Sequence, residues 1–401
     1  MVTYAVLKAA RWQAKAYRRT AVCYLMAVAL APLALSGEQD PAETSPQLRP
    51  LLVQGSEALQ RGDNAGAAAA FQRASELAPG SIEILNDLAI ALYREGKPEA
   101  AIAAYKRALK IAPGDFVTSA NLGIAYFRSQ RYAEALPLLQ EVAETKPSFQ
   151  SFELTGLTLF ALDRYKEASE YLEKANRLQP GDLTTLDMLG KAYLKSKNYA
   201  GAADVFRRVM AVNPNSAEAH MFMGMAYDKM NRETDAQQEY EAAEKADPTF
   251  LGVHSGLGLI YLREGKTEQA ESEFRAELTR YPHDAISNAM LGEILRKKNE
   301  PGQAIPYLRR AIDENPNYKE ALFELGKSEV MLAQAQQALE PLRKAISIDP
   351  NYYEAHFVLG TALRKLGRPE DAAHEFKIAE EIQARERAGL IKKVTKPEDQ
   401  P

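Results

Sequence analysis

The segment from residue 183 to residue 214 reads LTTLDMLGKAYLKSKNYAGAADVFRRVMAVNP, and it decides the fold because it recurs along the chain. Its Gly190, Ala202 and Pro214 each have counterparts at intervals of 34 residues, with a single interval of 33. The glycine series is Gly55, Gly123, Gly156, Gly190, Gly224, Gly258, Gly292, Gly326 and Gly360, with Ala89 in the second position. Three residue types that share one period indicate an internal repeat in ten copies.

Each repeated residue has a packing or chain-breaking role that predicts a pair of helices. Gly190 and Ala202 are small enough to let two helices approach closely. Phe206 lies one helical turn after Ala202, on the same face, and is expected to fill the space between neighbouring hairpins. Pro214 lacks an N–H and disfavours a helical residue before it, so it ends the second helix. The pattern predicts an all-α fold with two helices in each repeat and no strand.

The single 33-residue interval predicts where one residue is missing. It occurs in all three series between the third and fourth repeats, so the deletion lies between Pro147 and Gly156. A connection between helices tolerates such a deletion better than a helix does, and we expect it in the turn around Ser148.

The spacing of large and small residues resembles the signature of the tetratricopeptide repeat (TPR) family. In repeat five it consists of Leu186, Leu189, Gly190 and Tyr193 on the first helix and Ala202, Phe206 and Pro214 on and after the second. The resemblance covers residues 48–386 and implies an α-solenoid, a right-handed superhelix of about ten helical hairpins. Departures are Gln54 in repeat one, Glu329 where tyrosine is usual in repeat nine, and the absence of a closing proline in repeat ten.

The N-terminal segment has the layout of an export signal. Residues 1–19 contain five basic and no acidic residues, and an apolar run from Ala21 to Leu35 follows. We interpret residues 1–36 as a signal peptide, or as an uncleaved signal anchor, and residues 37–47 as a linker. Residues 387–401 are expected to form the capping end of the array and a disordered tail. The expected location is periplasmic or secreted, with anchoring to the inner membrane if the signal is not cleaved.

Charge and cysteine content limit the classes of partner and site. The formal net charge is −4, and loss of a leader with five basic residues and no acidic ones takes it to −9. An acidic chain does not attract phosphate backbones, so no nucleic-acid partner is expected. Cys23 is the only cysteine and lies within the leader, which leaves no thiol chemistry in a cleaved chain.

No catalytic, cofactor-binding or metal site is expected. The sequence has no His-Glu-x-x-His segment, no phosphate-binding loop and no Gly-x-Ser-x-Gly elbow. His220, His254 and His356 all occupy the fourth position of a first helix, which is normally a packing position, and we interpret them as packing residues. The repeats also use nearly the whole chain and leave no room for a catalytic domain.

The family resemblance implies that partners bind the concave face, which is lined by the first helix of each repeat. Counted from the start of that helix, positions five, nine and twelve carry several apolar and aromatic side chains. The predicted partner-binding residues are Asn86, Ile90, Tyr93, Ala120, Ile124, Phe127, Glu153, Leu157, Phe160, Met221 and Met225. An exposed apolar surface of this kind usually marks a binding site. The alternative is that these side chains form core between adjacent first helices.

The sequence therefore predicts a non-catalytic scaffold that binds a protein or peptide partner in an exported compartment. One alternative is a membrane-tethered assembly factor, which requires an uncleaved leader. An alternative of another class is the substrate-binding array of a glycosyltransferase-like enzyme, which is disfavoured because no catalytic domain fits in the chain.

Overall fold

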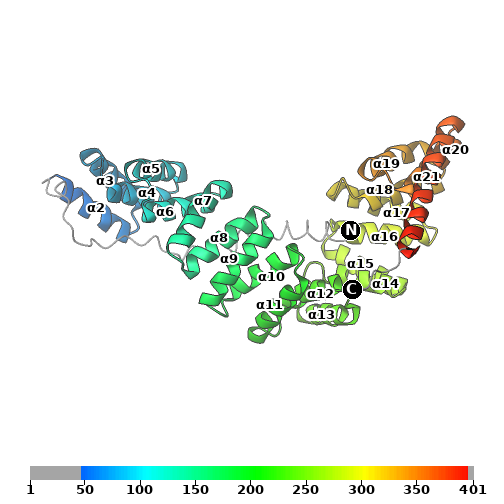
Figure 1. Ribbon diagram of the computed structural model, residues 1–401, viewed down its shortest axis with the longest axis horizontal. Coiled ribbons are helices and arrows are strands. Elements are labelled where there is room, and N and C mark those ends of the chain that lie inside the picture. The colour runs from blue at the N-terminus through cyan, green and yellow to red at the C-terminus, as the bar shows by residue number, and fades with distance from the viewer. Residues whose placement is uncertain (1–46, 396–401) are drawn as a thin grey trace. The chain divides into compact units, whose positions relative to one another are not determined.

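The computed structural model describes residues 47–395, and within these residues the chain is all-α, with twenty helices and no strand (Figure 1). The helices are α2 (Leu48–Gln60), α3 (Asn64–Leu77), α4 (Ile82–Arg94), α5 (Pro98–Ile111), α6 (Phe116–Arg128), α7 (Tyr132–Thr145), α8 (Phe149–Ala161), α9 (Tyr165–Leu178), α10 (Leu183–Lys195), α11 (Tyr199–Val212), α12 (Ala217–Lys229), α13 (Glu233–Ala246), α14 (Val253–Arg263), α15 (Thr267–Arg280), α16 (Ala285–Lys297), α17 (Pro301–Glu314), α18 (Lys319–Met331), α19 (Ala335–Ile348), α20 (Tyr353–Lys365) and α21 (Pro369–Thr395).

The described residues divide into two compact units, a first unit of residues 47–214 and a second unit of residues 215–395. Each unit consists of five helical hairpins, α2 to α11 in the first and α12 to α21 in the second. Within a unit, extensive contacts join helices that are consecutive in the chain, and smaller ones join first helices of adjacent hairpins, such as α4 with α6 and α16 with α18. Each unit is therefore a linear stack in which a hairpin is stabilised by its neighbours, the arrangement of an α-solenoid.

Local backbone chemistry sets the helix ends. Each of the nine repeated prolines lies two residues after a second helix, as Pro214 does after α11 and Pro350 after α19. The next first helix then commonly begins behind an Asp or Ser whose side chain accepts a backbone hydrogen bond, as Asp115 does from the N–H of Thr118 and Ser148 from that of Ser151. The prediction that proline ends each second helix is confirmed.

The glycine register positions the two helices of each hairpin. A Cβ added to Gly190 would lie 2.6 Å from the ring of Phe206, and one added to Gly292 would lie 2.5 Å from Leu308. The large residue therefore packs onto the glycine of its own hairpin, a contact that the sequence analysis did not predict. Tyr240 makes both kinds of contact, because it lies against Gly224 of its own hairpin and Gly256 of the next.

The missing residue of the fourth repeat lies where the sequence predicts it. Residues 146–148 connect α7 to α8, whereas four residues, such as 112–115 and 179–182, form most of the other connections between hairpins. The short connection is closed by a capping box, in which the Ser148 and Ser151 side chains each bind the other residue's backbone N–H. The deletion is thus absorbed outside the helices.

Each hairpin turn contains one residue in the left-handed region of backbone conformation. Glycine provides it in four turns, at Gly62, Gly96, Gly265 and Gly367. The other six turns use Gln130, Asp163, Lys197, Asn231, Asn299 and Ala333, with φ between 56° and 65°. A left-handed conformation strains most side chains, so packing of the two helices enforces the turn where glycine is absent.

The predicted leader, residues 1–36, and nearly all of the linker, residues 37–47, lie outside the described residues. At the other end, α21 continues to Thr395, well beyond the expected end of the array at residue 386. No helix among residues 47–395 combines the length and the apolar character that a membrane span requires.

Candidate functional site

The structure divides the predicted partner-binding residues into a buried and a half-buried group. The buried side chains are Asn86, Ile90, Leu157 and Met221, each at most 8% exposed. These four are core, because the neighbouring helices enclose them, and for them the prediction of direct partner contact is corrected. The half-buried residues are Tyr93, Ala120, Ile124, Phe127, Glu153 and Phe160 in the first unit and Met225 in the second.

Position five of the first helix links consecutive hairpins. The Asn86 amide donates a 2.8 Å hydrogen bond to Thr118 Oγ1, which in turn donates to Asp115. In the same way the Thr185 hydroxyl of α10 donates to Glu153 of α8 at 3.3 Å. Burial raises the pKa of Glu153, the nearby Asp182 raises it further, and the Thr185 hydrogen bond opposes them. These position-five side chains therefore hold adjacent hairpins together.

Position twelve of the first helix carries an aromatic ring in three consecutive hairpins, at Tyr93, Phe127 and Phe160. Phe127 packs edge-on against Tyr132 with ring centroids 5.5 Å apart, and Phe160 packs against Tyr165 in the same way at 5.2 Å. Each of these contacts joins a first helix to the second helix of the same hairpin. The contacts fix the rings while leaving part of each accessible, which suits an aromatic recognition surface.

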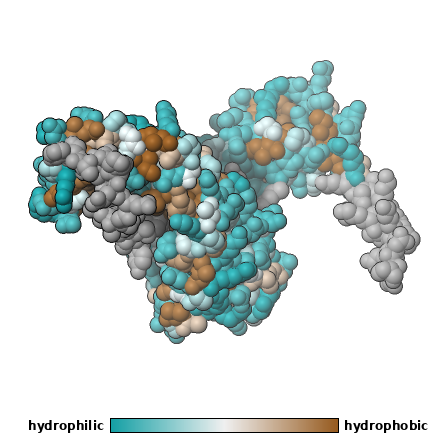
Figure 2. All heavy atoms as spheres, turned by 60° about the vertical axis from the view of Figure 1, so that its left-hand side comes forward, coloured by the Kyte–Doolittle hydropathy of each residue, from teal (hydrophilic) through white to brown (hydrophobic). Residues whose placement is uncertain are grey.

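A second group of apolar side chains lies at the ends of the second helices. Leu77, Ile111, Leu178 and Val212 are each the last residue of a second helix in the first unit and are 46–60% exposed. On the face shown in Figure 2, hydrophobic residues gather in separate patches within a mostly hydrophilic surface. The sequence interpretation missed this row, although its recurrence at the repeat period is visible in the sequence.

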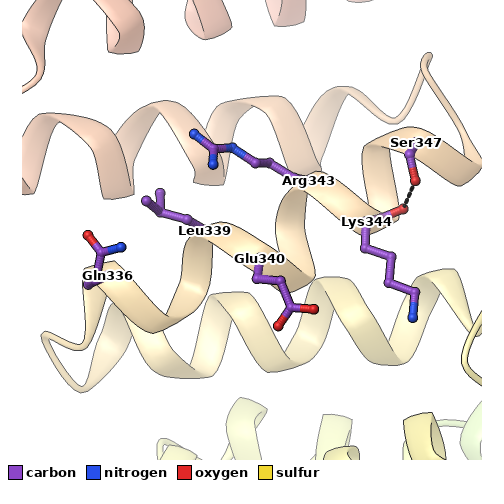
Figure 3. A pocket seen from close by; sticks show the side chains of 6 residues that line it. All are labelled: Gln336, Leu339, Glu340, Arg343, Lys344 and Ser347. Atoms are coloured by element: carbon purple, nitrogen blue, oxygen red, sulfur yellow. Dashed lines mark hydrogen bonds between the residues drawn. The ribbon is translucent and has the colours of Figure 1, made fainter.

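A shallow hollow of about 460 Å³ lies along α19 in the second unit. Its lining residues Gln336, Leu339, Glu340, Arg343, Lys344 and Ser347 all belong to that one helix (Figure 3). Ser347 donates to the carbonyl oxygen of Lys344 in the same helix. A hollow formed along one helix does not enclose a small molecule, so we assign it no binding role.

Three histidines pair with glutamates of their own hairpins. Nδ1 of His220, His254 and His356 lies 2.6–2.7 Å from a carboxylate oxygen of Glu239, Glu273 and Glu375, respectively. Each glutamate follows its histidine by 19 residues and lies on the second helix. The histidines lie between the two helices of their hairpins, and the sequence interpretation missed their polar partners.

Comparisons with known proteins identify the same repeats. Three family models, each described as tetratricopeptide repeat, match the chain: one over residues 52–116, 255–319 and 289–353, one over 92–152, 159–226 and 193–257, and one over 342–374. The chain is 28% identical over 194 residues to the type IV pilus assembly protein PilF of Pseudomonas aeruginosa, a match that covers 46% of this chain and 76% of PilF.

Solved structures with similar folds include YrrB, a TPR protein with an unusual peptide-binding site, at 24% identity and a TM-score of 0.42, covering 48% of this chain and 99% of YrrB. MamA from Desulfovibrio magneticus RS-1 matches at 22% identity and a TM-score of 0.40, covering 43% of this chain and 98% of MamA. With the hairpins, their glycine register and the family models in agreement, the chain belongs to the tetratricopeptide repeat family.

Proposed function

We propose that this protein is an exported, non-catalytic scaffold that binds a protein or peptide partner along the first helices of hairpins two to four. The observation that carries the proposal is the row of half-buried aromatic rings at Tyr93, Phe127 and Phe160. They occupy one repeat position on α4, α6 and α8, and Ile124 and Ala120 add half-buried apolar surface on the middle helix.

This surface is suited to recognition of an apolar segment with polar edges. Aromatic side chains supply large contact areas at a low cost in conformational entropy, and two of these rings are already held by tyrosines of their own hairpins.

Affinity capture from the exported fraction tests the proposal. The test variant is Tyr93→Ala, Phe127→Ala, Phe160→Ala in the full chain, and circular dichroism checks that it is folded. Ile124→Glu provides a second test variant, because it places a charge on the surface while leaving the three rings intact. We expect both variants to lose a partner that the wild-type chain retains.

The row at the second-helix ends supplies the matched control. Leu77→Ala, Ile111→Ala, Leu178→Ala also removes three apolar side chains at one repeat position of the first unit, and those side chains are more exposed. This control is expected to keep the partner. Loss of the partner in the control, with retention in both test variants, would move the binding surface to the second helices and contradict the proposal.

A second candidate is an assembly factor tethered to the membrane by its N-terminal segment. The similarity to PilF favours it, because PilF is a pilus assembly protein. N-terminal sequencing of the protein recovered from cells separates the two candidates. A new N-terminus near residue 37 would support a cleaved, exported scaffold, and an intact leader in the membrane fraction would support the tethered factor.

A further inference from the structure

Three side chains of the second unit converge between the sixth and seventh hairpins. Glu244 extends from α13, His254 from α14 and Glu273 from α15, and one ligand atom of each lies within 4.8 Å of the others. His254 Nδ1 is 2.7 Å from Glu273 Oε2 and 3.9 Å from Glu244 Oε1. The side chains are 16–40% exposed, so the cluster is held by packing but open to an ion from solvent.

The second ring nitrogen of His254 fixes the direction in which the imidazole presents its lone pair. Nε2 lies 3.2 Å from the carbonyl oxygen of Pro248. Carbonyl and carboxylate oxygens only accept hydrogen bonds, so without an ion both ring nitrogens donate, Nε2 to Pro248 and Nδ1 to Glu273. A metal ion would displace the hydrogen on Nδ1, and the lone pair so freed points toward the two carboxylates. A backbone carbonyl on the far nitrogen is the usual orienting partner of a metal-binding histidine.

The surroundings carry an excess of negative charge. Glu277, 1% exposed, lies near His254 and accepts hydrogen bonds from the backbone N–H groups of Gly252 and Ser255 at 2.8 and 3.3 Å. Burial and then Glu241, Glu273 and Glu244 raise the pKa of the nearby Tyr261 hydroxyl. The cation Lys266 lies 5.6 Å from the Tyr261 ring centroid. A bound divalent cation would relieve the repulsion among these carboxylates.

The tenth hairpin provides an internal comparison. His356 has the same two contacts, with Glu375 on Nδ1 at 2.6 Å and the carbonyl oxygen of Pro350 on Nε2 at 3.3 Å. Ten residues before His356 the chain has Ile346, whereas ten residues before His254 it has Glu244. A histidine–glutamate pair is therefore a structural element of this repeat, and the third carboxylate distinguishes the cluster around His254.

We propose that Glu244, His254 and Glu273 form a binding site for one divalent transition-metal ion of the Zn²⁺ class. One imidazole nitrogen and two carboxylate oxygens suit borderline cations such as Zn²⁺, whereas Mg²⁺ and Ca²⁺ prefer ligand sets made only of oxygen. Three protein ligands leave a coordination position for water. The ion connects the second helix of hairpin six to both helices of hairpin seven.

Isothermal titration of the full, EDTA-treated chain with Zn²⁺ at neutral pH tests the proposal. The test variants are His254→Leu and Glu244→Ile, of which the second places at this position the residue found in hairpin ten. The control is His356→Leu, which removes a histidine with the same two contacts but no third carboxylate. A third test variant is Glu273→Gln, which keeps the size of the side chain. If it loses Zn²⁺ binding, the lost carboxylate is the cause and not a loss of folding.

We expect one Zn²⁺ site in the wild-type chain and in His356→Leu. In each test variant the affinity should fall by more than the ~10–100-fold that loss of an orienting partner causes, because a direct ligand is lost. Bound Zn²⁺ should also raise the melting temperature of the wild-type chain, but not that of Glu244→Ile. Absence of Zn²⁺ binding by the wild-type chain, or equal binding by wild type and Glu244→Ile, would overturn the proposal.

Discussion

The two units fill the same repeat position with different chemistry. The residue four places before the repeated glycine, or before Ala89 in hairpin two, is Leu85, Ser119, Phe152 or Leu186 in hairpins two to five, and His220, His254, Asn288, Leu322 or His356 in hairpins six to ten. Leu186 lies in an apolar cluster with Val205, and Phe152 makes a ring contact with Tyr171, whereas His356 pairs with Glu375. In each case the partner lies 19 residues later. In these three hairpins the facing residue matches the chemistry of the position.

Replacing an apolar residue by a polar one, or the reverse, at this position should have the largest effect on the free energy of unfolding. Leu186→His would bury an imidazole at a site that is 1% exposed and faces Val205, which has no polar side-chain atom. We expect a loss of about 3 kcal/mol, from the lost apolar contacts and the unsatisfied ring nitrogens. His356→Leu loses its hydrogen bonds but leaves a carboxylate that can reach solvent, so we expect about 1–2 kcal/mol.

Amide hydrogen exchange, read separately for peptides of each unit, measures both losses. The double variant Leu186→His, Val205→Glu is the control, because it recreates the pair found in the second unit and should recover part of the loss. Equal losses for the two single variants, or no recovery in the double variant, would mean that the facing residue does not set the chemistry of this position.

A pH dependence of similar size is expected from a buried carboxyl group, Glu277, and a half-buried one, Asp87, in a lower window for the first unit than for the second. Burial, and then Asp284, raise the pKa of Glu277 in the second unit from 4.5 to about 7. Burial, and then Glu83, raise that of Asp87 in the first unit from 3.8 to about 6. Folded protein therefore holds a proton that unfolded chain has lost, and stability falls as pH rises through each window. The decrease for Glu277 is at most about 3 kcal/mol.

Unfolding of Glu277→Gln and of wild type, both in EDTA, at pH values near 5 and near 8 checks this prediction. The amide cannot ionise, so the variant should gain stability relative to wild type as pH rises, and any constant cost of the substitution cancels in the difference. Asp87→Asn should show its relative gain at lower pH. A stability difference for Glu277→Gln that is the same at both pH values would contradict the prediction.

Substitution of the repeated glycine should affect the two units alike. Gly190→Leu in the first unit and Gly224→Leu in the second would force a side chain against Phe206 and Tyr240, where even a Cβ would lie 2.6 and 2.9 Å away. Each variant should lose about 1–3 kcal/mol by overpacking. Thermal melts followed by circular dichroism measure the loss, and an unchanged melting temperature in either variant would contradict the glycine register for that unit.

The smallest expected effect is a gain of stability at the hairpin turns. Gln130 and Ala333 have φ of 60° where other hairpins have glycine. Gln130→Gly in the first unit and Ala333→Gly in the second should each stabilise the chain by about 0.5–1 kcal/mol, because strain is relieved at the expense of some chain entropy. Gly96→Ala is the reverse control and should destabilise it. A loss of stability in both glycine variants would show that the turns are not strained.

Features determined by local backbone chemistry could be predicted from the sequence. Proline and glycine restrict the chain in ways that do not depend on distant residues, so the hairpins, the ends of the second helices and the deletion near Ser148 were predictable. The spacing of large and small residues also identified the packing residues, such as Gly190 and Phe206, but not that Phe206 packs onto Gly190 of its own hairpin.

The remaining features depend on which helix faces lie opposite each other. Asn86 and Glu153 were predicted to line a groove, but they face threonines 32 residues later, and that pairing requires knowledge of the stacking. The histidine–glutamate pairs were missed because an interval of 19 residues matters only after two helices are aligned. The left-handed residue of each turn could not be predicted from the sequence, because most of the ten are not glycine.

The linear stacking of hairpins within each unit has a mechanical consequence. A helix there makes its extensive contacts only with its neighbours along the chain, so no distant strand or helix locks the ends of a unit in place. Pulled from its two ends, a unit should give way one hairpin at a time, each event releasing about 120 Å of extended chain. Such a stack should extend at low force and refold when the force is released, because no contacts between distant segments have to form again.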